Sequence, residues 1–175
     1  MKNKNILVIA CGDFDYGTLQ RKVFREHFHF FFENITSAPE KIDDFISYII
    51  EKYEPQDLDG VLGTHDGPES TVAAILAKEF GLHGLDPSIS FVCEHKYYSR
   101  VAQRKIVPGA VPQFQYLSVN GLKRDDVTLP YPFFVKPVKS AFSILARPVR
   151  DFETLEAFLP RVRERFAQSD RKSVV

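Results

Sequence analysis

Short apolar runs at regular intervals in the first half of the sequence constrain the fold more than any other feature. Residues 6–10, 29–32 and 58–63 each suit a strand, and the first run, ILVIA, is continuously apolar, as is typical of a strand buried on both faces. A segment with helical potential follows each run. This alternation predicts an α/β fold built on a doubly wound parallel sheet.

Two of the helices carry clear start and stop signals. Pro39 stands where a first helical turn tolerates proline, apolar side chains then recur at three- and four-residue spacing, and Pro55 ends the helix. Pro68 opens the other helix, and Gly81 stops it. A helix over residues 16–28 completes the pattern, so each expected strand has a helix behind it.

The carboxyl ends of the expected strands are the natural place for a site, because open α/β sheets bind ligands there. Residues 11–15, residues 34–37 and the run Thr64, His65 and Asp66 occupy these ends. The three residues of the run are candidates for a substrate edge, although Thr64 or Asp66 could equally cap the helix that starts nearby, and the two roles are compatible. The first turn lacks the G-x-G-x-x-G spacing and no Walker A sequence occurs, which disfavours a Rossmann oxidoreductase.

A helix is predicted to begin at residues 86–88 and to continue through the stretch 91–104. Lys96, Arg100 and Arg104 lie four residues apart and form one stripe on it, a pattern that usually marks a solvated face. The prolines of residues 107–112 break this helix, and a strand over 113–119 follows. We therefore expect a Rossmann-like domain over residues 1–86, a helical linker over 87–110 and an α+β segment over 111–175.

The segment LPYPFFVKPVKSAFSILAR, residues 129–147, reads as a hairpin. Side chains alternate along an extended run, so Phe133 and Val135 share one face and Lys136 lies on the other. The turn KSAFS carries a cation, hydroxyls and backbone N–H groups, and residues 142–147 suit the return strand. Such a tip can cover a phosphate, although a lysine at a strand end is more often an ordinary surface residue.

A last helix is expected after Asp151, which can cap its first turn, and Pro160 should kink or break it. Two strands, a hairpin and one helix are little material for a second domain, so they should leave an open sheet edge. Such an edge invites association, and a homo-oligomer is compatible with it, but the sequence does not determine the oligomeric state.

Composition narrows the classes of partner. Lys and Arg together number 23, as do Asp and Glu, and no run of five basic residues occurs, so neither nucleic acid nor an anionic membrane is an expected partner. Cys11 and Cys93 have no metal-binding spacing and are too few for a secreted disulfide framework. No apolar run is long enough for a signal peptide or a membrane helix. We expect a cytoplasmic protein with reduced thiols.

The order of these elements resembles the front half of the ATP-grasp ligases, the superfamily that includes D-alanine–D-alanine ligase, biotin carboxylase and L-amino-acid ligases. In HKYYSR, Lys96 matches the family's first nucleotide lysine, residues 107–112 match the proline-rich crossing, and Lys136 in PFFVKP matches the second lysine. The resemblance implies an incomplete α+β ATP-grasp subdomain after the Rossmann-like domain. It also implies that the residues contacting ATP are Lys96, Lys136, Lys139, Ser140 and Ser143.

Two departures from the family accompany this resemblance. The family's phosphate loop is rich in glycine, whereas KSAFSI keeps the serines and has no glycine, which should make the loop stiffer. The family's Mg²⁺ ligands, a Glu and a Glu-x-Asn pair, belong to a later half that has no counterpart before Val175. The chain thus looks like a truncated ligase, and we expect it to turn over no ATP.

The resemblance implies an activity for the intact protein: a small carboxylate attacks the γ-phosphate of ATP, and an amine or a thiol displaces phosphate from the resulting acylphosphate, with Mg²⁺ as cofactor. A first alternative is a non-catalytic, flavodoxin-like module that binds a small ligand or a partner at the Thr64, His65 and Asp66 edge. A second is a nucleotide-free, degenerate subunit that another chain completes.

Overall fold

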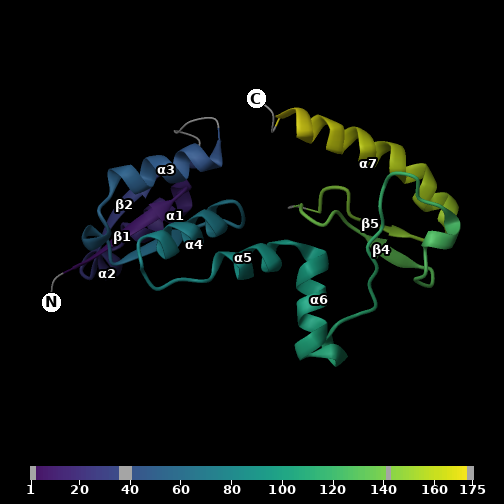
Figure 1. The fold of residues 1–175 in the computed structure, drawn as a ribbon, viewed down its shortest axis with the longest axis horizontal. Helices are drawn as coiled ribbons and strands as arrows, with labels where there is room; N and C mark the ends of the chain where they lie inside the picture. The colour runs from purple at the N-terminus through teal and green to yellow at the C-terminus, as the bar shows by residue number, and fades with distance from the viewer. Residues whose placement is uncertain (1–2, 36–40, 141–142, 173–175) are drawn as a thin grey trace. The chain divides into compact units, whose positions relative to one another are not determined.

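A three-stranded parallel sheet forms the centre of the first of two compact units, Met1–Glu94. The structure is a computed structural model that describes residues 3–35, 41–140 and 143–172. The strands are ordered β2-β1-β3, and β1 and β2 lie side by side (Figure 1). Leu7 at the centre pairs with Phe31 on one side and Val61 on the other. The strand bounds are β1 Lys4–Ile9, β2 Phe28–Glu33 and β3 Gly60–Gly63.

Five α-helices are described in this unit, and two of them cover the same face of the sheet. Leu7 and Ile9 of β1 pack with Phe45 and Ile49 of α3 and with Leu76 of α4, and all five side chains are less than 2% exposed. Burying a side chain of this size contributes about 1.5–3 kcal/mol, so this layer stabilises the unit substantially. The helix bounds are α1 Asp13–Leu19, α2 Lys22–Arg25, α3 Ile42–Lys52, α4 Glu69–Glu79 and α5 Pro87–Glu94, with a 3₁₀ turn at Pro55–Asp57.

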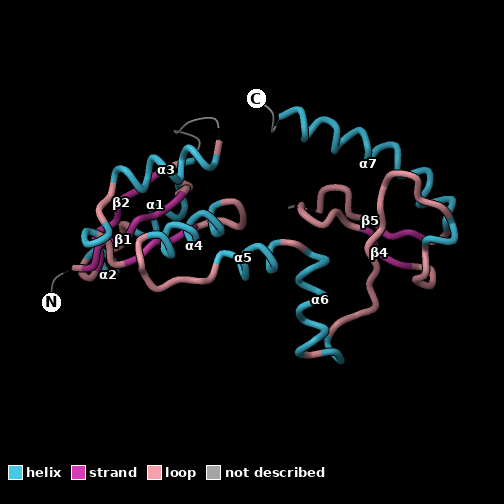
Figure 2. Tube along the Cα trace, viewed as in Figure 1, coloured by secondary structure: helices cyan, strands magenta, loops and turns pink. Residues whose placement is uncertain are grey.

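The predicted helix over residues 16–28 is wrong. Arg21 has an extended backbone with φ −61° and ψ 143°, and it separates the two short helices α1 and α2 (Figure 2). Phe28 has already left the helix, because it pairs with Lys4 in the sheet. A non-local strand pairing therefore overrides the local helical pattern here.

The start of α4 lacks the side-chain cap that the sequence suggested. Its N-cap is Pro68, and no side chain makes a capping hydrogen bond there, so neither Thr64 nor Asp66 caps this helix. Gly81 takes a left-handed φ of +67° just after the helix, which confirms it as the stop signal. Pro39, the other predicted start signal, lies outside the described residues.

A two-stranded antiparallel hairpin and a long helix organise the second unit, His95–Val175. Phe133 pairs with Val149, and both strands pack against the helix α7 (Figure 1). Segment 113–132 adds Leu117 and Tyr131, among others, to the same core. The bounds are α6 Lys96–Ile106, β4 Phe133–Val135, β5 Arg147–Val149 and α7 Phe152–Lys172, with 3₁₀ turns at Pro108–Ala110 and Arg124–Asp126.

Three predictions for this half need correction. The predicted helix over residues 91–104 is two helices, because His95 is extended and its Nδ1 accepts a hydrogen bond from the Tyr98 N–H at 3.3 Å, capping α6. Residues 113–119 join neither described sheet, although Leu117 and Val119 pack against the core of this unit. The return strand is Arg147–Val149 rather than residues 142–147, since the intervening turn uses Ser143 to Ala146.

The last helix has the predicted cap but is not broken by its proline. One carboxylate oxygen of Asp151 accepts from the Thr154 backbone N–H at 2.7 Å and from the Thr154 hydroxyl at 2.6 Å. Pro160 lies inside α7, which runs on to Lys172. Although α7 is long, no helix in the described ranges is both long and apolar enough to cross a membrane.

Candidate functional site

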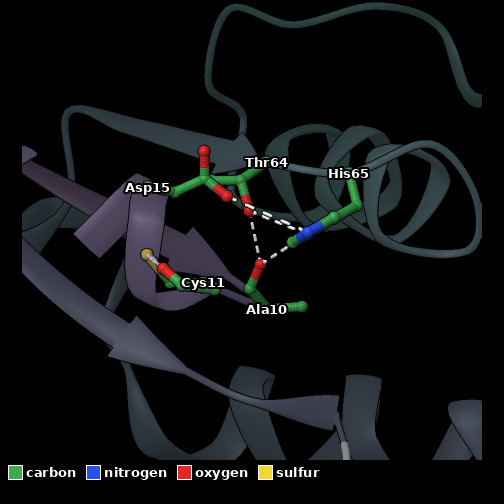
Figure 3. Close-up of polar contacts among 6 residues, drawn as sticks. Ala10, Cys11, Asp15, Thr64 and His65 are labelled. Carbon is green, nitrogen blue, oxygen red and sulfur yellow. Dashed lines mark hydrogen bonds and ion pairs between the residues drawn. The ribbon is translucent and has the colours of Figure 1, made fainter. Parts of the chain in front are cut away.

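A cluster of polar side chains gathers where β1 and β3 end (Figure 3). Ala10, directly after β1, takes a left-handed φ of 51°, a conformation that costs a residue with a Cβ roughly 1–2 kcal/mol. Its carbonyl oxygen accepts a short hydrogen bond from the Thr64 hydroxyl and a second from His65 Nδ1 at 3.1 Å. Strain of this kind is common where a backbone group is held for function.

His65 lies between this carbonyl and a carboxylate. Its Nδ1 is also 3.1 Å from the Thr64 hydroxyl oxygen, and its Nε2 is 3.9 Å from Asp15 Oδ2 (Figure 3). The His65 side chain is 53% exposed and that of Asp15 is 30% exposed, so solvent and small ligands reach both. The contacts hold the imidazole in one orientation at the edge of the sheet.

Cys11 is close to this cluster but is not an activated nucleophile. Burial, followed by the negative charge of Asp15, raises the pKa of its thiol. Its S–H donates to the Gly12 carbonyl oxygen at 3.6 Å. A cysteine nucleophile needs a lowered pKa and a nearby base, so this arrangement argues against thiol catalysis.

The structure thus brings together two of the three predicted substrate-edge residues. Thr64 and His65 belong to the cluster, whereas Asp66 is exposed in the turn before α4. Asp15 was not singled out from the sequence, although it lies in the 11–15 run that follows the first strand. The strand-end rule could have selected it, because parallel strands end at a common edge.

The two lysines that match the family motif lie close together in the second unit. The backbone N–H of Lys96, the first residue of α6, donates to the Val138 carbonyl at 2.9 Å, and its Nζ donates to the Ser140 carbonyl at 2.8 Å. Val138 and Ser140 follow Lys136 directly in the chain. These contacts tie the start of α6 to the loop after β4.

The electrostatics of this lysine pair are unfavourable without a ligand. Burial lowers the pKa of Lys96, and the positive charge of Lys136 lowers it further. In the part of the chain that the structure describes, neither lysine has a carboxylate within salt-bridge distance. Two neighbouring cations without an anion form a local excess of positive charge that suits a phosphate group.

The other predicted ATP-contacting residues are either exposed or already engaged in a hydrogen bond. Lys139 and Ser143 are exposed, and the Ser140 carbonyl is occupied by Lys96. Ser143 and Leu145 have left-handed φ values of 56° and 57°, so this loop adopts without glycine the conformation that glycine favours. Phe142, expected as a hydrophobic cap, lies outside the described residues.

Two hollows described in the second unit are lined by residues other than Lys96 and Lys136. One, of about 710 Å³, runs between the turn that begins at Ser143 and the face of α7 that carries Arg161 and Arg165. The other, of about 550 Å³, is lined by Tyr97, Phe114 and neighbouring residues. Among the predicted ATP-contacting residues, Ser143 lines one of these hollows, whereas Lys96 and Lys136 line neither. The hollows therefore do not by themselves identify the lysine pair as a binding site.

The described residues do not fit a magnesium ion. No group of three or more His, Cys, Asp or Glu side chains within residues 3–35, 41–140 and 143–172 could hold a metal. They do fit an anion, because the lysine pair has uncompensated charge.

Comparison with known proteins supports the fold. No family model matches the sequence, and a search of curated proteins finds no match. Among solved structures, the chain shares its fold with ATP-grasp ligases. The matched structure is an L-amino acid ligase from Bacillus licheniformis, with a TM-score of 0.70 and 18% sequence identity.

The match covers 93% of this chain and 43% of the ligase chain, so this chain spans less than half the length of its structural neighbour. It confirms the predicted fold class, a Rossmann-like parallel sheet followed by a partial α+β ATP-grasp segment. At this level of identity, the likeness concerns the fold and assigns no residue roles. The domain limits and the roles of the site residues stay predictions.

Proposed function

We propose that the chain is the ATP-binding portion of an ATP-dependent ligase that joins a small carboxylate to an amine or a thiol through an acylphosphate. The observation that carries this proposal is the convergence of Lys96 and Lys136, which come from different elements and have no neutralising carboxylate among the described residues. The fold shared with an L-amino acid ligase supports the same class of reaction.

The lysines would act by binding and stabilising phosphate charge. An ammonium group has three N–H donors, and Lys96 uses one of them on the Ser140 carbonyl, which leaves two for phosphate oxygens. Lys136, Lys139 and the backbone and hydroxyl groups of Ser140 and Ser143 would add donors around the triphosphate. In the reaction, a carboxylate oxygen bonds to the γ-phosphorus while ADP leaves, and the amine or thiol then bonds to the carbonyl carbon while phosphate leaves.

The sheet edge of the first unit would receive part of the small substrate. Thr64 and His65 already share contacts there, and Asp66 is the neighbouring exposed carboxylate. Mg²⁺, the family's usual cofactor, would be held by residues other than the described ones. Both cysteines are free thiols, which is consistent with a cytoplasmic protein.

Calorimetric titration with ATP tests the nucleotide site. Wild-type protein should bind ATP, and Lys96→Gln should weaken binding about 10- to 150-fold, because a hydrogen bond to a charged group contributes roughly 1.5–3 kcal/mol. Lys105→Gln removes an exposed lysine from the far end of the same helix and should leave the affinity unchanged. Equal affinities for wild type and Lys96→Gln would exclude the proposed site.

The second candidate function is a non-catalytic binding module. The observation in its favour is that the polar cluster of Figure 3 is complete within the first unit and uses none of the lysines. In this case a small ligand would bind wild-type protein and the double variant Lys96→Gln, Lys136→Gln equally well. Mass measurement with candidate partner chains would reveal the remaining alternative, a subunit completed by another chain.

A further inference from the structure

One face of α6 and the segment that follows it enclose a hollow within the second unit. The helix contributes four side chains whose i, i+4, i+7 and i+8 spacing places them on one face: Tyr97, Val101, Arg104 and Lys105. Phe114, Gln115 and Tyr116 complete the lining. The hollow has a volume of about 550 Å³, which is in the range of sites for small molecules.

Three aromatic rings form the walls of this hollow. The centroid of the Tyr97 ring lies 5.6 Å from that of Phe114, at an interplanar angle of 77°, and 5.5 Å from that of Tyr116, at 63°. Rings that meet at such steep angles form a corner, in which a flat ring can stack on one wall and meet another edge-on. Tyr116 is 56% exposed, so small molecules can reach this corner.

Two cations give the hollow a preference for negative charge. The Arg104 guanidinium carbon lies 4.1 Å from the centroid of the Phe114 ring, and one of its N–H groups donates to the Pro112 carbonyl at 3.0 Å. Arginine has five N–H donors, so most of them are left for a ligand. Among the described residues, no carboxylate lines the hollow, and no salt bridge involves Arg104 or Lys105. An anion is therefore attracted here, and a cation is repelled.

Gln115 fixes the segment that carries two of the aromatic rings. Its side-chain N–H donates to the Asp126 carbonyl, and its Oε1 accepts from the Thr128 backbone N–H at 2.9 Å and from the Thr128 hydroxyl at 3.1 Å. Leu117, two residues further on, packs against the core of the unit. A wall that is already held in place loses little conformational freedom when a ligand binds, which favours binding.

We propose that this hollow binds a small aromatic anion, a flat ring that carries a carboxylate or a phosphate group. The ring would occupy the corner between the aromatic walls, and the anionic group would accept hydrogen bonds from the Arg104 guanidinium, whose planar fork matches such groups. Lys105 adds positive charge beside it. The inference goes beyond the proposed function and does not depend on it, because neither Lys96 nor Lys136 lines this hollow.

Titration of the full chain at pH 7, followed by two-dimensional nuclear magnetic resonance, tests the inference with four probes. Benzoate and phenyl phosphate should shift the amide signals of residues 114–116 saturably, and the tighter of the two identifies the anionic group. Cyclohexanecarboxylate has the charge without the flat ring and should bind about 2- to 12-fold more weakly than benzoate. Benzylamine has the ring with the opposite charge and should cause no saturable shift.

Three results of this titration would overturn the proposal. These are the absence of a saturable shift with both aromatic anions, equal affinities for benzoate and cyclohexanecarboxylate, and saturable binding of benzylamine. The first would reduce the aromatic cluster to ordinary packing, the second would remove the role of the rings, and the third would remove the role of the cations.

Variants of the lining with a matched control locate the ligand. Tyr116→Ala should weaken benzoate binding about 2- to 12-fold, whereas Tyr116→Phe keeps the ring and should retain the affinity. Tyr98→Ala removes a tyrosine that is also 56% exposed but does not line the hollow, and it should change nothing. Arg104→Gln should weaken benzoate binding about 10-fold or more, because a hydrogen bond between two charged groups is lost. Unchanged affinity in Tyr116→Ala or in Arg104→Gln would overturn the placement.

One further variant separates this hollow from the proposed nucleotide site, since the lysine pair could also attract benzoate. Lys96→Gln should bind benzoate as wild type does, even though it has lost affinity for ATP. A loss of benzoate affinity in this variant would move the ligand to the lysine pair and overturn the inference. If benzoate fails to bind wild type while Lys96→Gln still shows the expected loss of ATP affinity, the inference falls and the proposed function stands.

Discussion

The charge of Lys136 should have opposite effects on folding and on nucleotide binding. Burial lowers the pKa of Lys96, and the charge of Lys136 lowers it further. A lysine with a lowered folded-state pKa destabilises the fold while it is protonated, and this penalty is relieved as the pH rises toward the ordinary value of 10.5. In Lys136→Gln one of the two causes is removed, so the pKa of Lys96 should rise and the ligand-free protein should become more stable at neutral pH.

The size of each effect follows from the exposure of the two groups. Lys96 is partly exposed and Lys136 is exposed, so the repulsion should be in the range of surface charge pairs, about 0.2–1 kcal/mol. For a unit of this size, that corresponds to a rise in Tm of about 1–8 °C. ATP affinity should fall about 10- to 150-fold, because one hydrogen bond between an ammonium group and phosphate is lost.

Thermal unfolding of ligand-free protein at pH 7 and at pH 11, together with ATP titration at pH 7, measures both effects. The gain in Tm should be present at pH 7 and smaller at pH 11, because Lys96, whose pKa is lowered from 10.5, has lost most of its charge there. Lys4→Gln removes an exposed lysine from the first unit and should change neither quantity. A lower Tm at pH 7, or ATP affinity equal to that of wild type, would refute the assignment of Lys136 to an anion site.

Three further predictions concern the scaffold. Gly63→Ala should destabilise the protein by about 1–3 kcal/mol in urea unfolding, because its Cβ would lie 2.7 Å from a backbone oxygen of α4. Gly60→Ala should destabilise it less, because the added Cβ meets the flexible end of a side chain at 3.2 Å. A larger loss of stability in Gly60→Ala than in Gly63→Ala would contradict this reasoning. Ile49→Ala should lower the free energy of unfolding by about 2–5 kcal/mol, because a fully buried side chain is lost; a change below 1 kcal/mol would contradict its place in the core. The hydrogen bonds from Thr154 lower the pKa of Asp151, so they stabilise α7 above the unfolded-state pKa of 3.8, and this stabilisation is lost as the pH falls through the folded-state pKa. Asp151→Ala should therefore reduce Tm at pH 7 and make the difference in Tm between pH 7 and pH 3 smaller. An unchanged difference would exclude the cap.

The sequence by itself determined the elements whose causes are local. The continuously apolar run at residues 6–10 predicted β1, and the three- and four-residue spacing of apolar side chains from Ile42 to Tyr53 predicted α3. Gly81 marked the end of α4 through its tolerance of positive φ, and Asp151 marked the start of α7 through its side-chain oxygen. The alternation of these elements was sufficient for the fold class.

The tertiary structure alone decided where local preference gave way to distant partners. Phe28 leaves a helical pattern because β1 offers it a strand partner. Residues 113–119 form no strand, and their side chains Leu117 and Val119 pack against the core of the second unit. The meeting of Lys96 with the Ser140 carbonyl, and of His65 with the Ala10 carbonyl, joins residues that are 44 and 55 positions apart. No periodicity encodes such contacts, because each depends on the packing of whole elements that brings two loops together.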